Sequence, residues 1–329
     1  MMKSSEQTRR EEALKLLADY RAGEVPASGY RTMIMQWGKA RLFEARPAIE
    51  PFLRSPDVSL RTTALDVLGN MFALQDYWSV AVQFLLYDPD YQARTVGASA
   101  LASMQDHTKD RRTLGVLASV VADRYDYELV RVDAYRAMFV VARGYQLAYD
   151  DWDALEAASD EPFDVDRDAD WDFVNGCIDP QLEEEWQREA RMLLEQYRAG
   201  KVAEQEYYAM LRKFGRARLQ EARKDVEEFL SSPVLLLRTT ALRVLVLYLQ
   251  ISNGWQVVVD MFEHDPDEAN RLAALDVLSQ LMAGTHDKAT LRILYPLAYD
   301  AQRGKGVFGA ILKIYPGDFG EIKDYLAAP

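Results

Sequence analysis

The sequence has little of the chemistry on which enzymes and metal sites depend. Its 329 residues include one cysteine, Cys177, so no disulfide can form within the chain. Cys177 lies in an acidic segment, where neighbouring carboxylates are expected to raise the pKa of the thiol and make it a poor nucleophile. The three histidines, His107, His264 and His286, have no companion at metal-ligand spacing, and no Walker loop or nucleophile elbow occurs. We therefore expect no catalytic residues, no metal, no cofactor and no enzymatic activity.

Long hydrophobic runs and an excess of positive charge are missing as well. No stretch approaches the roughly 18 apolar residues of a membrane helix, and residues 1–12 lack the apolar core of a signal peptide. The net charge of −13 argues against a nucleic-acid binder, which needs Lys and Arg to displace counterions. The scarcity of cysteine fits a reducing compartment. We therefore expect a cytoplasmic protein that binds neither nucleic acid nor membranes.

Signals for β-strands are weak, whereas helical signals run through the chain. There is no sustained alternation of apolar and polar residues. Ala13, Leu16, Leu17 and Tyr20 instead share one face of a helix, which Gly23 is suited to end. The hydrophobic content of 49% is enough for a sizeable core. The sequence therefore predicts an all-α protein.

Two long stretches of the chain resemble each other closely. Residues 13–104 align with residues 190–281 at a constant shift of 177 positions (190 − 13), without a gap. Trp78, for example, recurs as Trp255. Such self-similarity predicts a tandem duplication with two homologous blocks. The predicted parts are a first block at 11–146, an acidic connecting segment at 147–187 and a second block at 188–326.

A helical pair recurs within each block. Asp57 and Asp90 each follow a proline at a predicted helix start, 33 positions apart, and Arg61 and Arg94 keep the same spacing. One helical pair about every 33 residues is typical of an α-solenoid. The pattern of Pro-Asp, three residues, Arg and then alanines and leucines resembles the second helix of HEAT repeats, especially the bacterial phycobilin-lyase-like type. The resemblance is carried by the stretches 57–72, 90–104, 127–141, 234–249 and 267–282.

The resemblance implies roles for this helix and for its arginine. In HEAT repeats the second helix of each pair lines the concave side, and the arginine pairs with an aspartate near the start of a neighbouring repeat's helix. Val234 replaces one of these aspartates, so we expect the ladder of pairs to be broken there. A binding surface formed by the arginines is the less favoured alternative. The expected structural ladder consists of Asp57, Arg61, Asp90, Arg94, Arg131, Arg238, Asp267 and Arg271.

Negative charge is concentrated in the connecting segment. Between residues 147 and 187, 15 Asp and Glu residues stand against one Arg. An alternating run there has the spacing of an EF-hand calcium loop at its first three acids. However, Ala169 stands where that loop needs Gly, and Asn175 stands where it needs a bidentate Glu, so a calcium site is not favoured. The alternating acids are Asp164, Asp166, Asp168, Asp170 and Asp172.

Aromatic residues among these acids indicate an ordered segment rather than a flexible linker. Packing against the neighbouring repeat is the favoured arrangement, and docking on a partner is the alternative. The residues predicted to contact a partner are Trp152, Asp164, Asp166, Asp168, Asp170, Trp171 and Asp172.

The predicted function is that of a non-catalytic scaffold that holds a protein partner in its concave face, because solenoids offer large binding surfaces. The localised negative charge predicts a basic partner, as for a bacterial immunity or antitoxin-like protein that meets a basic toxin. Two other functions follow only from the resemblance. A chromophore-lyase-like HEAT enzyme is the first, and a DNA-repair HEAT-like glycosylase, which the net charge disfavours, is the second.

Overall fold

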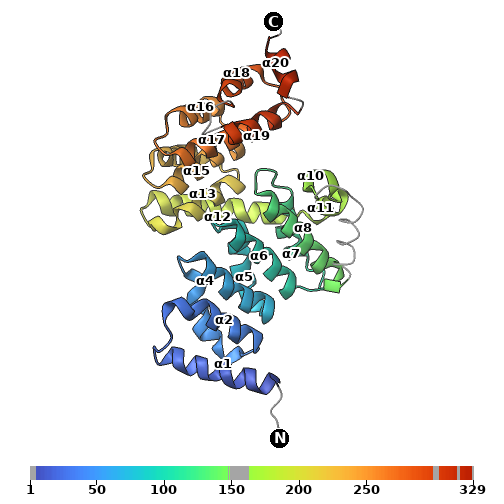
Figure 1. The fold of residues 1–329 in the computed structure, drawn as a ribbon, viewed down its shortest axis with the longest axis vertical. Helices are drawn as coiled ribbons and strands as arrows, with labels where there is room; N and C mark the ends of the chain where they lie inside the picture. The colour runs from blue at the N-terminus through green and yellow to red at the C-terminus, as the bar shows by residue number, and fades with distance from the viewer. Residues whose placement is uncertain (1–4, 147, 149–162, 299–303, 317–318, 328–329) are drawn as a thin grey trace. The chain divides into compact units, whose positions relative to one another are not determined.

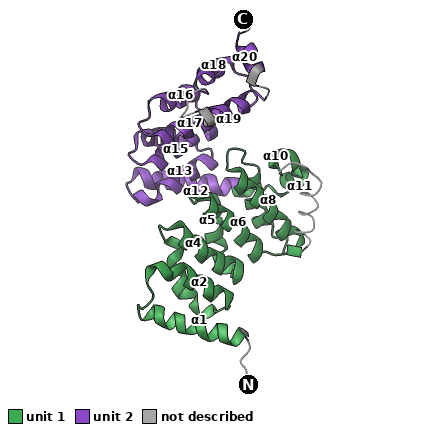
Figure 2. Ribbon diagram, in the orientation of Figure 1, with its two compact units in different colours: residues 1–182 green, residues 183–329 purple. Residues whose placement is uncertain are grey.

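The computed structural model describes residues 5–146, 148, 163–298, 304–316 and 319–327 (Figure 1). Among these residues every regular element is a helix, as predicted, and none is a strand. The chain divides into two compact units, Met1–Leu182 and Glu183–Pro329 (Figure 2). Within the described part of the chain no helix is long and apolar enough to cross a bilayer.

The helices of the first unit follow one another with short connections. The first five are α1 (Ser5–Arg21), α2 (Tyr30–Lys39), α3 (Arg46–Ile49), α4 (Val58–Leu65) and α5 (Trp78–Tyr87). A π-helical segment, η4 (Asp66–Met71), continues α4 without a break. The remaining helices are α6 (Tyr91–Met104), α7 (Arg111–Val121), α8 (Glu128–Arg143), α10 (Val165–Asp168) and α11 (Trp171–Cys177).

The second unit repeats this plan after α12 (Pro180–Arg198), which contains the unit boundary. Its helices are α13 (Tyr207–Arg216), α14 (Arg223–Glu228), α15 (Leu235–Arg243), α16 (Gly254–His264), α17 (Glu268–Leu281), α18 (Lys288–Leu297), α19 (Gly304–Ile314) and α20 (Phe319–Ala327). A second π-helical segment, η9 (Val244–Tyr248), continues α15 as η4 continues α4. The two units therefore contain similar series of helical pairs.

Each unit is a stack of helical pairs with a shared core. In the first unit α5 packs on α6 and α7 on α8, while α6 also packs on α4 and α8. The second helices α4 with η4, α6 and α8 thus form one layer, which we call the inner helices of that unit. In the second unit the inner helices are α15, α17 and α19, and α17 packs on both α15 and α19. Gly97 permits the tight α5–α6 contact, because a Cβ there would lie 2.6 Å from the backbone nitrogen of Leu85.

Local sequence signals explain where the inner helices begin. The Asp57 carboxylate accepts hydrogen bonds from the first amides of α4, and the Asp90 carboxylate does the same for α6. These caps satisfy amides that have no partner within the helix. Val234 stands at the start of α15 and supplies no side-chain cap.

The likeness of the two units extends to unusual backbone geometry. Arg41 and Arg218 occupy equivalent positions and both have a φ of 48°, although neither is glycine. Ala73 and Gln250, again equivalent, both have a φ of 50°. Such left-handed residues are uncommon, so their recurrence at the ends of the same helices reflects one repeated tertiary plan.

The described part of the acidic segment packs on the first unit, as the favoured interpretation predicted. The ring of Phe163 stacks on Tyr135 of α8 with centroids 5.7 Å apart. Val165 and Val174 are fully buried, and the backbone amide of Asp170 donates a hydrogen bond of 2.7 Å to the hydroxyl oxygen of Tyr135. Residues 163–182 therefore close the end of this helical stack.

Candidate functional site

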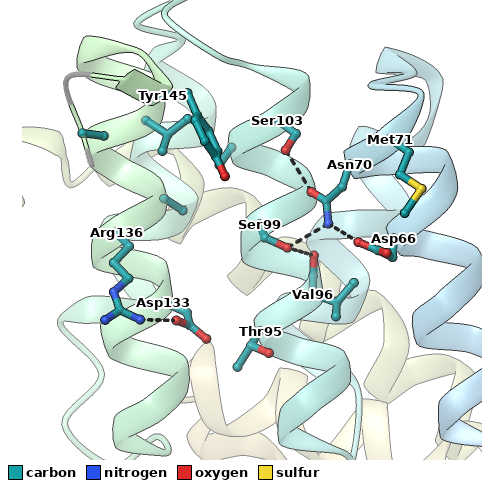
Figure 3. A pocket seen from close by; sticks show the side chains of 14 residues that line it. Asp66, Asn70, Met71, Thr95, Val96, Ser99, Ser103, Asp133, Arg136 and Tyr145 are labelled. Carbon is teal, nitrogen blue, oxygen red and sulfur yellow. Dashed lines mark hydrogen bonds and ion pairs between the residues drawn. The ribbon is translucent and has the colours of Figure 1, made fainter. Parts of the chain in front are cut away.

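A hollow of about 840 Å³ lies on the inner helices of the first unit. Residues of three successive inner helices and of the segment after α8 line it (Figure 3). We call it the inner groove. Its lining residues are Asp66, Asn70, Met71, Thr95, Val96, Ser99, Ala102, Ser103, Asp133, Arg136, Ala137, Val140, Tyr145 and Ala148.

The groove has a floor of small side chains and two walls that carry charge. Helix α6 supplies the floor, with Ser99 near its centre. Asp66 at the start of η4 lies on one wall, and Asp133 and Arg136 of α8 lie on the other (Figure 3). Small side chains on the middle helix leave space between its two neighbours, and this is the origin of the hollow.

A hydrogen-bond network fixes the wall that η4 forms. The side-chain amide of Asn70 donates to the Asp66 carboxylate at 2.8 Å and to the hydroxyl of Ser99 at 3.0 Å. The hydroxyl of Ser103 donates to the Asn70 carbonyl oxygen at 2.9 Å. Asn70 thereby links η4 to α6. Interruptions of this kind in an α-helix are frequent at functional sites, and here the π-helical turn carries both polar residues of the wall.

The opposite wall carries a carboxylate in an unfavourable environment. Burial raises the pKa of Asp133, and the charge of Arg136 opposes that effect only in part. The contact between the guanidinium of Arg136 and the Asp133 carboxylate is long, at 3.4 Å. A carboxylate that has lost solvent in this way gains more than an exposed one from an added cation.

The second unit differs at the equivalent positions. With the shift of 177 positions, Asp66 corresponds to Arg243 and Ser99 to Asp276. Arg243 forms an ion pair with Asp276 across two inner helices, and Lys313 of α19 approaches the same carboxylate at 3.4 Å. Internal ion pairs therefore bridge this face of the second unit, whereas the first unit has a hollow.

Sequence reasoning missed the groove, although a signal for it was available. The residues on either side of Asp66 are the same in both copies, Leu65 and Val67 in the first. Asp66 itself and Ser99 differ in charge from their counterparts. Where two equivalent helices share their neighbouring residues but differ in charge at one position, that position faces the groove rather than the core.

The arginine ladder forms, but its acids are not those expected. Arg61 donates to both carboxylate oxygens of Asp88, at 2.8 and 2.9 Å. Arg94 donates in the same way to Asp126, and both side chains of this pair are almost completely buried. Arg94 also donates to the carbonyl oxygen of Leu85 at 2.7 Å. Each arginine thus joins its inner helix to the connection that precedes the next one.

The expected acids instead cap their own helices. Asp57, Asp90 and Asp267 each accept hydrogen bonds from amides in the first turn of the helix that follows. In the first unit the arginine of the preceding repeat meets Asp88, two residues earlier than Asp90. The two aspartates of the Asp-Pro-Asp turn therefore have different functions, which sequence spacing alone did not separate.

The ladder in the second unit is not broken at the place predicted. Arg238 donates to Asp265 at 3.1 and 3.2 Å, so the replacement of the capping acid by Val234 does not break this pair. Arg271 donates to the carbonyl oxygen of Asp265 at 2.7 Å, but its buried Nε has no acceptor among the described residues. Among the residues that the structure describes, Arg271 therefore has no carboxylate partner.

The acidic segment supplies the aspartate of one more arginine–aspartate pair in the ladder. Arg131 donates to both carboxylate oxygens of Asp166, at 2.6 and 3.1 Å, and lowers the pKa of Asp166. Asp164 and Asp170 cap α10 and α11. Asp168 pairs with its neighbour Arg167, which lowers the pKa of Asp168. Four of the predicted partner-contacting acids thus have local structural contacts.

The other residues predicted to contact a partner have fewer structural contacts of their own. Trp171 is half-buried, with its indole nitrogen 3.4 Å from the carbonyl oxygen of Asp166, and Asp172 is exposed. Trp152 lies outside the described residues. In the described ranges no group of three or more His, Cys, Asp or Glu side chains is placed to hold a metal ion. The pKa of Cys177 is raised, but by burial, and Arg111 acts in the opposite direction.

A glycine pattern near the end of the chain has the spacing of a nucleotide-binding motif but a different structure. Gly304, Gly306 and Gly309 have the Gly-x-Gly-x-x-Gly spacing of dinucleotide-binding loops. They lie in helix α19 rather than in a loop between a strand and a helix. The spacing therefore does not form a phosphate-binding turn here.

Comparisons with known proteins give likenesses among solved structures only at low sequence identity. No protein-family model matches the chain, and no curated protein sequence matches it. Among solved structures, the chain is similar to the complex of CpcE and CpcF of phycocyanin lyase from Nostoc sp. PCC7120. The likeness has a TM-score of 0.29 and 15% sequence identity, and it covers 86% of this chain and 93% of that chain.

Proposed function

We propose that the protein is a non-catalytic HEAT-like scaffold whose first unit holds a protein partner in the inner groove. The observation that carries this proposal is the hollow of about 840 Å³ that extends over three inner helices. A groove of this kind offers both hydrogen-bonding groups and apolar surface, as partner-binding grooves do. Its described lining contains no histidine or cysteine.

We further propose that the partner is basic and that the protein acts in the cytoplasm as an immunity or antitoxin-like inhibitor. The net charge of −13 favours the approach of a cationic protein. The acidic segment supports this through its exposed carboxylates, although several of its acids also have structural contacts. Asp172, Glu183 and Glu184 are exposed on this part of the chain.

Capture of the native partner tests the proposal. The full chain is immobilised and exposed to host extract, alongside the variants Ser99→Trp and Gln83→Trp. Ser99→Trp fills the groove, whereas Gln83 is an exposed residue of α5 outside the groove lining. We expect the wild type and Gln83→Trp to retain the same partner and Ser99→Trp to lose it.

Salt dependence tests the electrostatic part separately. Retention of a basic partner should fall as the salt concentration rises, because mobile ions screen exposed charges. A captured partner that is acidic, or retention that is indifferent to salt, would contradict the proposed charge complementarity. Equal capture by the two tryptophan variants would contradict the groove as the binding site.

A chromophore-lyase-like activity remains the alternative, and a bilin titration separates it from the scaffold. An enzyme of that type must bind the free chromophore, and binding changes the chromophore's absorbance. We expect no change in the bilin spectrum when the purified chain is added. A saturable change that Ser99→Trp abolishes would favour the lyase-like function instead.

A further inference from the structure

We propose that the inner groove binds an arginine or lysine side chain of the partner between Asp66 and Asp133, above Ser99. The inference rests on the proposed scaffold function and specifies which chemical group of the partner the groove recognises. The second unit provides the evidence, because its equivalent face is bridged by charges that belong to the chain itself.

The second unit shows how charges bridge the inner helices of this fold. Asp276 lies on the middle inner helix, α17, and pairs with Arg243 on one side and Lys313 on the other. The order of charges across the face is therefore cation, anion, cation. Asp276 also accepts a hydrogen bond of 3.0 Å from Gln280, so its carboxylate is well satisfied.

The first unit has the opposite charge on one wall and a neutral centre. Asp66 replaces the cation of Arg243, and Ser99 replaces the anion of Asp276. On the other wall Asp133 joins Arg136, which occupies the position of Lys313. Figure 3 shows the carboxylates of Asp66 and Asp133 on opposite sides of the α6 floor. The missing element is a central cation.

The dimensions of the fold allow this cation to reach its acids. Arg243 reaches Asp276 from the wall to the middle helix of the second unit. In the second unit a long side chain, Arg243, and a short one, Asp276, together span the gap between two inner helices. In the first unit the short side chain is Asp66, and the arginine or lysine of the partner supplies the long one. Asp66 keeps acceptor capacity beyond its bond to Asn70, because a carboxylate has about four acceptor sites.

The groove suits a side chain on a peptide segment better than a bare cation. Val96, Met71 and Val140 contribute apolar surface against which the stem of an arginine or lysine can pack. The volume of about 840 Å³ exceeds that of one side chain and leaves room for a segment of the partner. The partly buried carboxylate of Asp133, whose pKa is raised by burial, gains stability when a cation approaches.

The first test supplies the cation from within the chain. Ser99→Lys places an ammonium group on the groove floor, and Ser99→Met adds a neutral side chain of similar length as the control. We expect Ser99→Lys to raise the thermal midpoint by about 2 °C relative to Ser99→Met. The gain should disappear when Asp66→Asn is combined with it. A midpoint for Ser99→Lys at or below that of Ser99→Met would overturn the inference.

The second test supplies the cation from outside. A fluorescently labelled twelve-residue peptide in which arginine alternates with alanine is titrated with the full chain, and its anisotropy is measured. The double variant Asp66→Asn/Asp133→Asn should weaken binding at least tenfold. The control Glu12→Gln/Glu24→Gln changes the net charge equally at two exposed residues outside the groove. A matched peptide with citrulline in place of arginine should not bind.

The outcomes separate this inference from the proposed function. Equal peptide binding by the two double variants would show that net charge, and not the groove, attracts cations, and would overturn the inference. If the peptide and Ser99→Lys results are as expected but no native partner depends on the groove, the cation site stands and the scaffold function fails. If groove-dependent capture succeeds but Asp66→Asn/Asp133→Asn has no effect on it, the scaffold stands and the cation site fails.

Discussion

Arg131 holds Asp166 as Arg94 holds Asp126, with two guanidinium nitrogens on the two oxygens of one carboxylate. The acidic segment thereby takes the place of a further repeat at the end of the stack in the first unit. Asp166 is also one of the acids predicted to contact a partner. Its position shows that charge in this segment has a structural use as well as any electrostatic one.

The Arg131–Asp166 pair should make the docking of α10 sensitive to acid. Because Arg131 lowers the pKa of Asp166 in the folded state, the pair stabilises the fold above the ordinary pKa of an aspartate, near 3.8. This contribution is lost as the pH falls through the lowered value. Since the Asp166 side chain is 65% exposed, solvent reduces the effect. Asp166→Asn should cost about 1 kcal/mol at pH 7.

Chemical denaturation of the wild type and Asp166→Asn at pH 7 and pH 3 checks this prediction. The difference between the two proteins should shrink at pH 3, because below pH 3.8 the Asp166 carboxylate of the unfolded chain takes up a proton, which reduces the advantage of the lowered pKa in the folded state. A difference that is the same at both pH values would show that the pair does not act through the charge of Asp166.

The buried pair in the middle of the ladder should matter much more. The side chains of Arg94 and Asp126 are 1% and 0% exposed. Asp126→Asn leaves a buried guanidinium without its counter-charge, so the free energy of unfolding should fall by about 3–5 kcal/mol. Urea denaturation, with Glu24→Gln as a surface control, measures the change. A loss below about 1 kcal/mol would contradict the assignment of this pair as a buried ion pair.

Equivalent arginines in the two units should respond differently to replacement. Arg94→Met should strongly destabilise the protein, because Asp126 would be left buried without a cation. Arg271→Met removes one hydrogen bond to a carbonyl oxygen and a buried Nε that has no acceptor among the described residues, so its effect should lie within about 1 kcal/mol of zero. Thermal unfolding of both variants in parallel tests the contrast, and equal losses would refute it.

Restoring the missing cap should stabilise the second unit. Val234 is 50% exposed at the start of α15 and provides no side-chain acceptor. Val234→Asp recreates the cap that Asp57 forms on α4 and should add about 1 kcal/mol to the free energy of unfolding. Val234→Ala is the control for the loss of the exposed apolar side chain. Equal stability of the two variants would show that the cap does not form.

The close contact of α5 and α6 should not tolerate a methyl group. A Cβ on Gly97 would lie 2.6 Å from the Leu85 nitrogen and 2.9 Å from the Ala81 oxygen, both backbone atoms. Gly97→Ala should therefore cost about 1–3 kcal/mol. Gly176→Ala is the matched control, because nothing lies within 4 Å of the added methyl group there. Similar stabilities for both variants would contradict the packing.

Local chemistry explains why much of the fold was predictable. Asp57 and Asp90 cap helices whose amides are two or three residues away, so the cap depends on neighbouring positions in the chain. The predicted all-helical class and the recurring pairs follow from signals of the same short range. The ladder was predictable only in outline, because Asp88 and Asp90 both lie just before Tyr91, the first residue of α6, and the spacing did not show which of them the arginine reaches.

The inner groove was not predicted, because its residues come from three helices. Asp66 and Asp133 are 67 positions apart (133 − 66), and nothing in the spacing indicates that both line one hollow. The small side chain of Ser99 opens the space only because α6 lies between α4 and α8. A comparison of charges between the two copies could have pointed to these positions.

The sequence by itself determined the helices and their caps, since each depends on hydrogen bonds or periodicity within a few turns of the chain. Only the tertiary structure decided which carboxylate each arginine reaches and which repeated face stays open. Packing decides these points because an ion pair or a groove depends on distances between helices, and those distances are set by the side chains of the whole stack. For that reason Asp166 became part of the ladder, and Asp66 became part of the proposed binding site.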